Sequence, residues 1–364
     1  MMRTDRIHMQ HALRLAGRGL GQVAPNPAVG CVIVRDGIIV GRGCTQKGGR
    51  PHAETVALAG AGDAARGATA YVTLEPCSHH GRTPPCAGAL IAAGIARVVA
   101  AVEDPDPRVS GRGIAMLRDA GLAVDVGLLA AEAAALNAGF FLRVMEKRPL
   151  VTLKLAVSAD GMIARAPGGE QWLTGEGARR FGHFLRATHD AILVGSGTVL
   201  ADDPDLTCRI AGLEDRSPLR VVLDGRLRMP PGAKLVRTAE IVPVIVYTAA
   251  EGGEGLRAAS VEAVRLAAGA DGGVDLRAVL GDLAERGITR LLVEGGAAVA
   301  QGFLDRGLAD RLEIFRSPVV AGAGGRPAPV FPLENYTLTG TRQFGPDRLE
   351  RYERRAMDPL SSKI

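Results

Sequence analysis

Four residues in the first third of the chain have the types and spacing of a metal-dependent catalytic site. His52 and Glu54 are separated by a single residue, and Cys77 and Cys86 follow further along the chain. One histidine and two cysteines give zinc three protein ligands and leave the fourth tetrahedral position to water, which is typical of a catalytic zinc ion. Water on such an ion ionises near neutral pH. Glu54 stands close enough to one ligand to reach this water without binding the metal, so we expect its carboxyl group to carry protons during catalysis.

The alternative is a closed zinc site that only holds loops together. Such a site needs a fourth protein ligand, for which His79 or His80 is available, but it leaves Glu54 without a role. We therefore favour the catalytic site, and we interpret His79 and His80 as polar loop residues or substrate contacts. The other cysteines are expected to be small core residues, and they are Cys31, Cys44 and Cys208.

The segments around these residues predict a first α/β domain. Expected helices cover residues 5–18, 52–59, 114–120 and 131–145, and expected strands cover residues 29–34, 38–43, 70–74 and 97–102. Asp36-Gly37 suits the turn of a hairpin between the first two strands. Pro76-Cys77 is expected to open one more helical segment, which carries Cys86. Because strands and helices alternate, the domain is expected to have three layers.

The pattern starts again after Pro149. Apolar strands are expected over residues 150–158, 191–194, 220–223, 244–248 and 290–293, with helical segments between several of them. This pattern predicts a second α/β domain whose mostly parallel sheet carries a nucleotide cofactor at its strand ends. With 364 residues, of which 47% are hydrophobic, the chain can bury two cores. We assign residues 1–147 to the first domain and residues 148–364 to the second.

The overall composition excludes several classes of protein. The net charge is +5, but the basic residues are scattered along the chain and only 4% of residues are aromatic. Both observations argue against a nucleic-acid-binding groove. Five cysteines, an odd number, do not suggest a disulfide framework and fit a reducing cytoplasm. Charged residues interrupt the amino-terminal stretch, and no later apolar run is long enough to span a bilayer. We therefore expect a cytoplasmic protein that binds neither nucleic acid nor membrane.

The distance between the two metal-type cysteines is unusual. His-x-Glu followed by Pro-Cys and a later cysteine is the signature of nucleobase deaminases, in which two residues usually separate the cysteines. Here eight residues separate Cys77 from Cys86, within PCSHHGRTPPC. This segment and PNPAVG at residues 25–30 resemble the bifunctional deaminase and reductase family of riboflavin biosynthesis. The resemblance implies a cytidine-deaminase-like fold and a substrate contact for Asn26, although an asparagine between two prolines often serves only the backbone.

The resemblance covers nearly the whole chain. The matching segments are LKLAVSADG at residues 153–161, GEQWLT at 169–174, LRA at 185–187, GSGTVLADDP at 195–204 and VEGG at 293–296. It implies a dihydrofolate-reductase-like fold for the second domain and NADPH as its cofactor. Gly295 and Gly296 follow an apolar strand and precede a helix, which lets backbone amides approach a pyrophosphate. By itself, that pair also fits an ordinary turn between a strand and a helix.

Matching positions also assign ligand contacts in the second domain. The implied NADPH contacts are Ala156, Trp172, Thr198, Asp202, Gly225 and Gly296. The implied substrate contacts are Lys154, Glu170, Arg186, Leu206, Arg209 and Glu294. Arginine suits this task because the guanidinium group matches the oxygens of a ribose phosphate. The alternative for each arginine is a solvated surface side chain.

Two positions depart from the family, whose members commonly carry serine where this chain has Glu170 and Gly225. Arg226 or Arg228 is our candidate to meet the 2′-phosphate of NADPH instead, a hypothesis based on charge and position. Lys154 belongs to a strand expected to be buried on both faces, so its ammonium group needs an acidic partner or the ligand. It is either a positive charge beside the ribose during hydride transfer or one half of a structural ion pair.

Together these resemblances imply two successive reactions on one riboflavin precursor. The first site would remove the 2-amino group of a diaminopyrimidinone that carries a ribosylamino 5′-phosphate. The second would use NADPH to open and reduce the ribose to a ribityl chain. The implied cofactors are one zinc ion per chain and NADPH, and the implied partners are a phosphorylated pyrimidine and further copies of the chain in a homo-oligomer.

Three other interpretations remain open at this point. The first is a zinc deaminase of another pyrimidine or of a base in nucleic acid, with a non-catalytic nucleotide-binding second domain. The second is a module that binds zinc and a nucleotide without catalysis, which the presence of Glu54 argues against. The third is a folate reductase in the second half, which the attached deaminase signature makes a poor fit.

Overall fold

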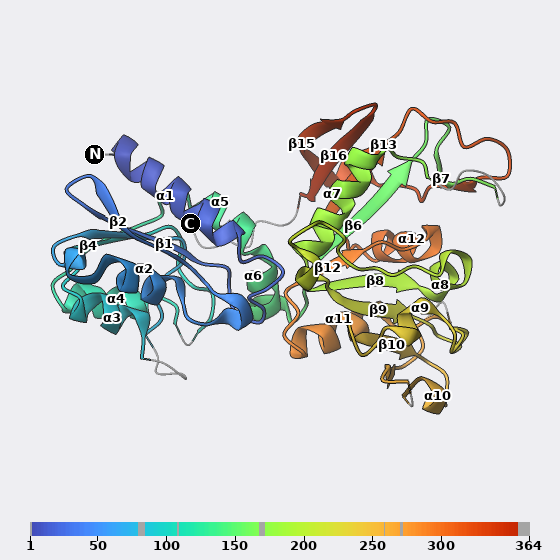
Figure 1. Cartoon of the computed structure of the whole chain (residues 1–364), viewed down its shortest axis with the longest axis horizontal. Helices are drawn as coiled ribbons and strands as arrows, with labels where there is room; N and C mark the ends of the chain where they lie inside the picture. Colours follow the sequence, from blue (N-terminus) through green and yellow to red (C-terminus); the bar gives the residue numbers. More distant parts are fainter. Residues whose placement is uncertain are drawn as a thin grey trace. The chain divides into compact units, whose positions relative to one another are not determined.

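The computed structural model describes residues 2–78, 84–107, 109–166, 172–257, 259–269 and 272–355. The chain divides into two compact units, Met1–Arg148 and Pro149–Ile364. Each unit has its own main sheet (Figure 1). Within the described residues, no helix has both the length and the apolar character needed to cross a membrane.

The first unit contains a five-stranded sheet in the order β2-β1-β3-β4-β5. β1 pairs antiparallel with β2 and β3, whereas β3, β4 and β5 are parallel. The strands are β1 (Gly30–Arg35), β2 (Ile38–Cys44), β3 (Thr69–Val72), β4 (Arg97–Ala100) and β5 (Ala123–Val126). The helices are α1 (Met2–Gly17), α2 (Ala53–Ala61), α3 (Cys86–Ala92), α4 (Arg112–Asp119), α5 (Ala130–Leu136) and α6 (Ala138–Glu146). The helix α1, with α5 beside it, covers one face of the sheet and α2, α3 and α4 cover the other (Figure 1), so the three layers are confirmed.

Glycines allow the two helices beside the hairpin to pack directly on the strand backbone. A Cβ atom on Gly30 of β1 would lie 1.9 Å from the carbonyl oxygen of Ala12 in α1. A Cβ atom on Gly43 of β2 would lie 2.1 Å from the carbonyl oxygen of Ala53, the first residue of α2. Any side chain at Gly43 would therefore push away the first turn of α2, which carries Glu54.

Two sequence predictions in the first unit are wrong. The helix expected over residues 131–145 is broken at Asn137 into α5 and α6, because the side chain of Asn137 bonds to the backbone of Ala28. Pro76-Cys77 does not open a helix, since α3 begins only at Cys86. The edge strand β5, largely exposed and without an apolar alternation, was not predicted.

The second unit contains a nine-stranded sheet in the order β11-β10-β9-β8-β12-β6-β13-β16-β15. The seven strands from β11 to β13 are parallel, which confirms the mostly parallel sheet, and β16 and β15 add an antiparallel edge. The strands are β6 (Leu150–Val157), β8 (Ala191–Gly195), β9 (Leu219–Leu223), β10 (Val244–Thr248), β11 (Glu262–Arg265), β12 (Arg290–Val293), β13 (Arg311–Arg316), β15 (Tyr336–Phe344) and β16 (Asp347–Arg354). A separate two-stranded sheet joins β7 (Met162–Ala164) and β14 (Arg326–Pro327).

Helices cover both faces of this sheet and enclose two large apolar cores, besides a small cluster of Ala178, Phe315 and Leu349. One core forms between the sheet and α11 and α12, and the other between the sheet and α7, α8 and α9. The helices are α7 (Glu176–Ala187), α8 (Ser196–Asp202), α9 (Lys234–Arg237), α10 (Glu254–Arg257), α11 (Leu276–Glu285) and α12 (Ala297–Asp305). The strands β8 and β12 are parallel neighbours; α8 begins directly after β8, and α12 begins after a short turn that follows β12. The first turns of both helices therefore lie at the same edge of the sheet, where ligands bind in open α/β folds.

Candidate active sites

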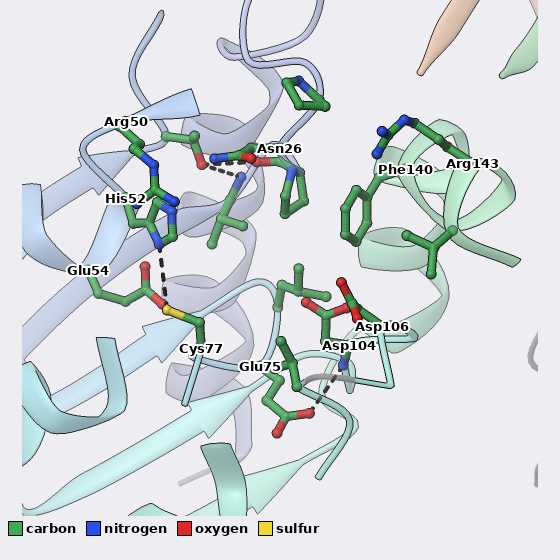
Figure 2. Close-up of a pocket in the computed structure, with 17 residues that line it drawn as sticks. Asn26, Arg50, His52, Glu54, Glu75, Cys77, Asp104, Asp106, Phe140 and Arg143 are labelled. Carbon is green, nitrogen blue, oxygen red and sulfur yellow. Dashed lines mark hydrogen bonds between the residues drawn. The ribbon is translucent and has the colours of Figure 1, made fainter. Parts of the chain in front are cut away.

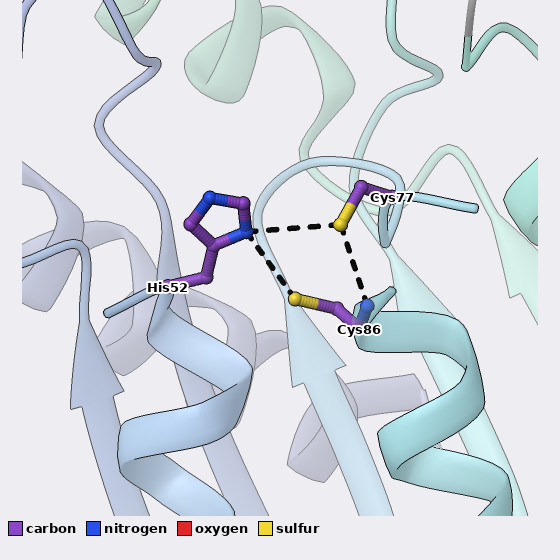
Figure 3. Close-up of side chains that lie close together, drawn as sticks. All are labelled: His52, Cys77 and Cys86. Atoms are coloured by element: carbon purple, nitrogen blue, oxygen red, sulfur yellow. Dashed lines mark hydrogen bonds between the residues drawn. The ribbon is translucent and has the colours of Figure 1, made fainter. Parts of the chain in front are cut away.

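The three metal-type residues of the first unit converge on one point. His52 precedes α2, Cys77 lies in the loop after β3, and Cys86 is the first residue of α3. The Nδ1 atom of His52 lies 3.7 Å from Sγ of Cys77 and 3.3 Å from Sγ of Cys86 (Figure 3). One ligand atom from each residue lies within 4.8 Å of the other two. Within the part of the chain that the structure describes, this is the one such group of three.

The chemistry of these donors fits zinc. The hydrogen bonds from Cys86 and His52 lower the pKa of the Cys77 thiol to about 4, although burial opposes the change. The hydrogen bond with Cys77 and burial raise the pKa of Cys86. The two sulfur atoms therefore share a negative charge beside an imidazole, and thiolate and imidazole are the ligands that zinc prefers. His79 and His80, the alternative fourth ligands, lie outside the described residues.

Glu54 lies in the first turn of α2, with 3% of its surface exposed. Burial raises the pKa of its carboxyl group to about 7. A general acid and base works best when its pKa is near the working pH. Glu54 and His52 line the same cavity as Cys77 (Figure 2), so the carboxyl group can exchange protons with a molecule held there.

The cavity has a volume of about 320 Å³, which is at the small end of the range for ligand pockets. Besides His52, Glu54 and Cys77, its polar and aromatic lining residues are Asn26, Thr45, Arg50, Glu75, Asp104, Asp106, Phe140 and Arg143. Among these, only Asn26 had been singled out from the sequence. The cavity is therefore shaped largely by residues that carry no motif.

The substrate loop suggested by the sequence is held in place by its neighbours. Asn26 Nδ2 donates a 2.7 Å hydrogen bond to the carbonyl oxygen of Gly49. Gly49 has a φ of 83°, and a Cβ atom there would lie 2.6 Å from Asn26 Nδ2, so this contact requires glycine. Thr45 Oγ1 donates to the carbonyl oxygen of Pro27 at 3.1 Å and accepts from the amide of Val29 at 3.0 Å. Asn26 thus lines the cavity and also serves the backbone.

Glu75 fixes the opposite side of the cavity. Its carboxylate accepts hydrogen bonds from the backbone amides of Asp104, Gly111, Gly113 and Ile114, at 3.2, 2.9, 2.9 and 3.3 Å. These bonds hold the segment that carries Asp104 and Asp106 at the cavity wall. In the sequence, only its position directly before Pro76-Cys77 could have indicated a role for Glu75.

In the second unit, Lys154, Arg186 and Glu294 form a compact ion cluster. Arg186 Nε donates a hydrogen bond to Oε1 of Glu294, and Arg186 Nη2 donates one to Oε2, both at 2.9 Å. Lys154 Nζ lies 3.7 Å from Oε2 of Glu294. Burial alone would raise the pKa of Glu294, but the charges of Arg186 and Lys154 hold this pKa at about 2. The acidic partner predicted for Lys154 is therefore present.

The other expected substrate contacts lie in the segment after α8. Arg186 Nη1 donates to the carbonyl oxygen of Thr207 at 3.0 Å, which ties this segment to the ion cluster. Leu206 is buried and has a φ of 57°, a conformation that L residues rarely adopt. Arg209 is half-exposed, and its Nη1 atom lies 3.5 Å from Oδ2 of Asp205. Glu170 lies outside the described residues.

Close packing brings two of the expected cofactor contacts together. Cβ atoms on Gly195 and Gly295 would lie 2.7 and 2.8 Å from the side chain of Val299, so both turns require glycine. A Cβ atom on Gly296 would lie 3.7 Å from Oγ1 of Thr198 and 3.5 Å from Nη1 of Arg326. Glycine at this position leaves the first turn of α12 open to a phosphate group beside a hydroxyl and a guanidinium, which fits NADPH.

The remaining expected cofactor contacts come from other elements of the second unit. Ala156 lies near the end of β6 and Asp202 at the end of α8. Trp172 is 58% exposed, and its ring centre lies 5.2 Å from the guanidinium carbon of Arg179. Gly225 follows β9, and Arg228 donates a 2.9 Å hydrogen bond to Oγ of Ser196 at the start of α8.

Family models match both units. The Cytidine and deoxycytidylate deaminase zinc-binding region matches residues 2–102, and the RibD C-terminal domain matches residues 149–349. The riboflavin biosynthesis protein RibD of Escherichia coli is 43% identical over 361 residues, covering 94% of this chain and 97% of the relative. The chain belongs to the RibD family. The RibD protein of Aquifex aeolicus is also similar, with 44% identity over 322 residues and 88% of each chain covered.

Solved RibD structures have the same fold. A structure of RibD from Acinetobacter baumannii has a TM-score of 0.88 and 37% identity, covering 97% of this chain and 99% of that chain. A deaminase and reductase from Thermotoga maritima has a TM-score of 0.86 and 36% identity over the same shares. The predicted fold class is confirmed. The chain is therefore a bifunctional enzyme of riboflavin biosynthesis, with a zinc-dependent deaminase unit and an NADPH-dependent reductase unit.

Proposed function

We propose that residues 1–147 deaminate 2,5-diamino-6-(5-phosphoribosylamino)pyrimidin-4-one, and that residues 148–364 reduce the ribosyl chain of the product, 5-amino-6-(5-phosphoribosylamino)uracil. The Thermotoga maritima relative is described as a diaminohydroxyphosphoribosylaminopyrimidine deaminase and 5-amino-6-(5-phosphoribosylamino)uracil reductase. The observation that carries the proposal is the convergence of His52, Cys77 and Cys86 beside the buried carboxyl group of Glu54.

In this proposal, His52, Cys77 and Cys86 hold the zinc ion and Glu54 moves protons. Bound zinc supplies the Lewis acidity that makes water a nucleophile near neutral pH. The Glu54 carboxylate takes a proton from the attacking water and gives it to the ring nitrogen beside the carbon under attack. It then helps to protonate the departing amine, which leaves as ammonia. Support comes from the raised pKa of Glu54, about 7, which permits both proton uptake and release.

In the second unit, we assign substrate binding to the ion cluster and its neighbours. Bound NADPH supplies the hydride. Lys154 keeps a positive charge beside the ribose, and Glu294 fixes the direction of the Arg186 guanidinium through two hydrogen bonds. Arg209 and Leu206 belong to the segment that Arg186 holds through Thr207. Glu170 and Asn26 remain assigned to substrate contact, in the second and first unit respectively.

Cofactor binding is assigned to the edge of the sheet at α8 and α12. The proposed NADPH contacts are Ala156, Trp172, Thr198, Asp202, Gly225 and Gly296. For the 2′-phosphate we favour Arg228 over Arg226, because Arg228 bonds to Ser196 at the start of the helix that carries Thr198 and Asp202. We also propose that the enzyme is a homo-oligomer of the cytoplasm and does not bind nucleic acid; its five unpaired cysteines are compatible with a reducing compartment.

The test uses zinc-loaded protein and the diaminopyrimidinone ribosylamino phosphate, with and without NADPH. We expect ammonia release without NADPH, and NADPH oxidation and a reduced product when it is added. Glu54→Gln should slow deamination by about 100-fold to 10,000-fold, as expected for loss of a general acid and base. Glu132→Gln is the matched control, since Glu132 is 53% exposed on α5.

This assay tests the deaminase and the reductase assignments separately. If zinc-loaded wild type releases no ammonia, the deaminase assignment is wrong. If ammonia appears but NADPH is not consumed, the second unit does not reduce this product. Equal activity of Glu54→Gln and wild type would exclude the proton-transfer role while leaving the reaction itself in place.

A further inference from the structure

Two buried side chains from distant strands fix the backbone that follows Trp172. Ser317 Oγ, directly after β13, donates a 2.5 Å hydrogen bond to the carbonyl oxygen of Leu173. Asp347 Oδ2, at the start of β16, accepts a 2.7 Å bond from the amide of Gly175. Both side chains are buried, so water does not compete for these bonds. The backbone beside Trp172 therefore has a defined position.

Arg179 of α7 joins this backbone to the indole ring. Its Nη1 atom donates a 2.6 Å hydrogen bond to the carbonyl oxygen of Thr174, and its guanidinium carbon lies 5.2 Å from the ring centre of Trp172. A guanidinium group over an aromatic face is attracted by the ring and stacks on it through its own flat surface. One side chain thus restrains both the main chain at Thr174 and the side chain of Trp172.

The indole ring is exposed although it is restrained. Trp172 is 58% exposed, whereas the next residue, Leu173, is buried. Ordering a side chain costs conformational entropy, and an exposed ring regains little of it from packing. A ring that is ordered in advance does not have to be ordered when a ligand binds, so the cost of binding is lower. The arrangement therefore suits a flat ligand group that packs on the indole ring.

The strand order indicates which flat group of NADPH lies at this position. The strands β9, β8, β12, β6 and β13 are consecutive neighbours in the sheet. The proposed phosphate contacts Arg228, Thr198 and Gly296 follow β9, β8 and β12 respectively, whereas the Trp172 segment is bonded to the residue directly after β13. Hydride transfer requires the nicotinamide ring to lie beside the ion cluster, which includes Lys154 of β6. The nicotinamide ring therefore lies on the Trp172 side of the phosphates, and the adenine ring on the other.

We propose that Arg179 is a positioning residue of the reductase, which holds the indole ring of Trp172 in the orientation that packs against the nicotinamide ring of NADPH. Ser317 and Asp347 fix the backbone from which the ring projects. Neither the motifs nor the family resemblance singles out these three residues. The inference rests on the proposed NADPH contact of Trp172 and deepens it.

The single tryptophan of the chain allows a direct test. Tryptophan emission overlaps the absorption of reduced nicotinamide, so energy transfer from Trp172 to bound NADPH reports on the distance and orientation of the two rings. Titration of the full-length enzyme with NADPH, followed by Trp172 fluorescence, gives the Kd and the quenching at saturation. Arg179→Gln should raise the Kd by about 5-fold to 50-fold, because one charge-assisted hydrogen bond and one cation–π contact are lost. It should also weaken the quenching at saturation.

Arg180→Gln is the matched control, because Arg180 is the next residue of α7 and is exposed. It should bind NADPH and quench fluorescence as wild type does. Arg179→Lys keeps the charge but loses the planar fork, so its Kd should lie between those of wild type and Arg179→Gln. Ser317→Ala releases the carbonyl oxygen of Leu173 without changing Arg179 and should raise the Kd in the same direction. In activity assays, Arg179→Gln should raise the KM for NADPH and leave the deaminase rate unchanged.

The outcomes separate a positioning role from a structural one. If Arg179 only stabilises α7, Arg179→Gln will lower the stability of the second unit but keep the wild-type Kd and quenching, and the proposal is overturned. If wild type binds NADPH by titration calorimetry without quenching Trp172, the proposed NADPH contact of Trp172 is wrong. Absence of NADPH binding in wild type would contradict the proposed reductase function instead.

Discussion

The two units of the chain hold their functional groups in opposite ways. In the deaminase unit, one nitrogen and two sulfur donors of His52, Cys77 and Cys86 point toward one another. In the reductase unit, the carboxylate of Glu294 lies between the cations Lys154 and Arg186. The first group is electron-rich and is completed by a bound cation, whereas the second is already balanced by its own charges. Loss of one residue should therefore remove the metal in the first unit and destabilise the fold in the second.

The largest effect is expected from Cys86→Ser. Loss of a supporting residue outside the ligand set of a zinc site already weakens metal binding by about 10-fold to 100-fold, so loss of a ligand should cost more than about 100-fold. Purified Cys86→Ser should contain little zinc and should not deaminate. It should still oxidise NADPH when it is given the deaminated substrate. Metal analysis and the two activity assays measure these outcomes.

Cys44→Ser is the matched control for that variant. Cys44 is a half-buried cysteine of β2 in the same unit, outside the metal-type group. It should retain zinc and both activities. A Cys86→Ser protein that keeps wild-type zinc content after dialysis would show that the three residues do not form the metal site.

A smaller effect, on stability rather than metal content, is expected from Glu294→Gln. This change leaves Lys154 and Arg186, whose side chains are 24% and 15% exposed, without their counter-charge. Removing one partner of a buried ion pair costs about 3–5 kcal/mol. The chain has a single tryptophan, Trp172, in the second unit, so urea unfolding followed by its fluorescence reports on that unit. Glu251→Gln is the control, because Glu251 is 82% exposed and pairs with Arg265 at the surface.

The ion cluster also gives a pH dependence with a definite sign. The pKa of Glu294 is about 2 in the folded chain, below its ordinary value of 4.5. Its contribution to stability is therefore fully present above pH 4.5 and is lost as the pH falls toward 2. A difference of this size corresponds to roughly 3 kcal/mol. The stability gap between wild type and Glu294→Gln should be constant above pH 4.5 and should shrink below it; a constant gap throughout would exclude a lowered pKa.

The difference between the two units also explains which parts of each site the sequence could predict. His52 and Glu54 are two residues apart, and the cysteines lie in a short segment, so local spacing alone indicates a zinc deaminase. The walls of the same cavity come from distant parts of the chain. Asn137 bonds to Ala28 across 109 positions, and this bond breaks the predicted long helix and directs Phe140 and Arg143 into the cavity. No local periodicity carries that information.

In the reductase unit, the resemblance identified individual positions but not their interactions. Arg186 and Glu294 are 108 positions apart, and the strand order that brings them together depends on the pairing of β6, β8 and β12. Arg326 beside Gly296 was missed for the same reason, since it reaches the cofactor edge from the separate strand β14. Pattern and propensity predicted the core strands because their apolar runs are local, whereas the contacts at their ends are set by the tertiary fold.

The smallest expected effect concerns Gly225 at the proposed cofactor site, where the sequence resemblance implies a serine hydroxyl group that this chain lacks. A Cβ atom on Gly225 would lie 3.8 Å from Val274 and 3.9 Å from the backbone of Gly273, so the Cβ atom of a serine fits without displacing its neighbours. Gly225→Ser should change the free energy of unfolding by less than about 0.5 kcal/mol. It should lower the Kd for NADPH by about 3-fold to 10-fold, because one added hydrogen bond contributes about 0.5–1.5 kcal/mol. Gly225→Ala supplies the Cβ without the hydroxyl and should leave the Kd unchanged, and equal Kd values for the two variants, measured by titration calorimetry, would remove Gly225 from the NADPH site.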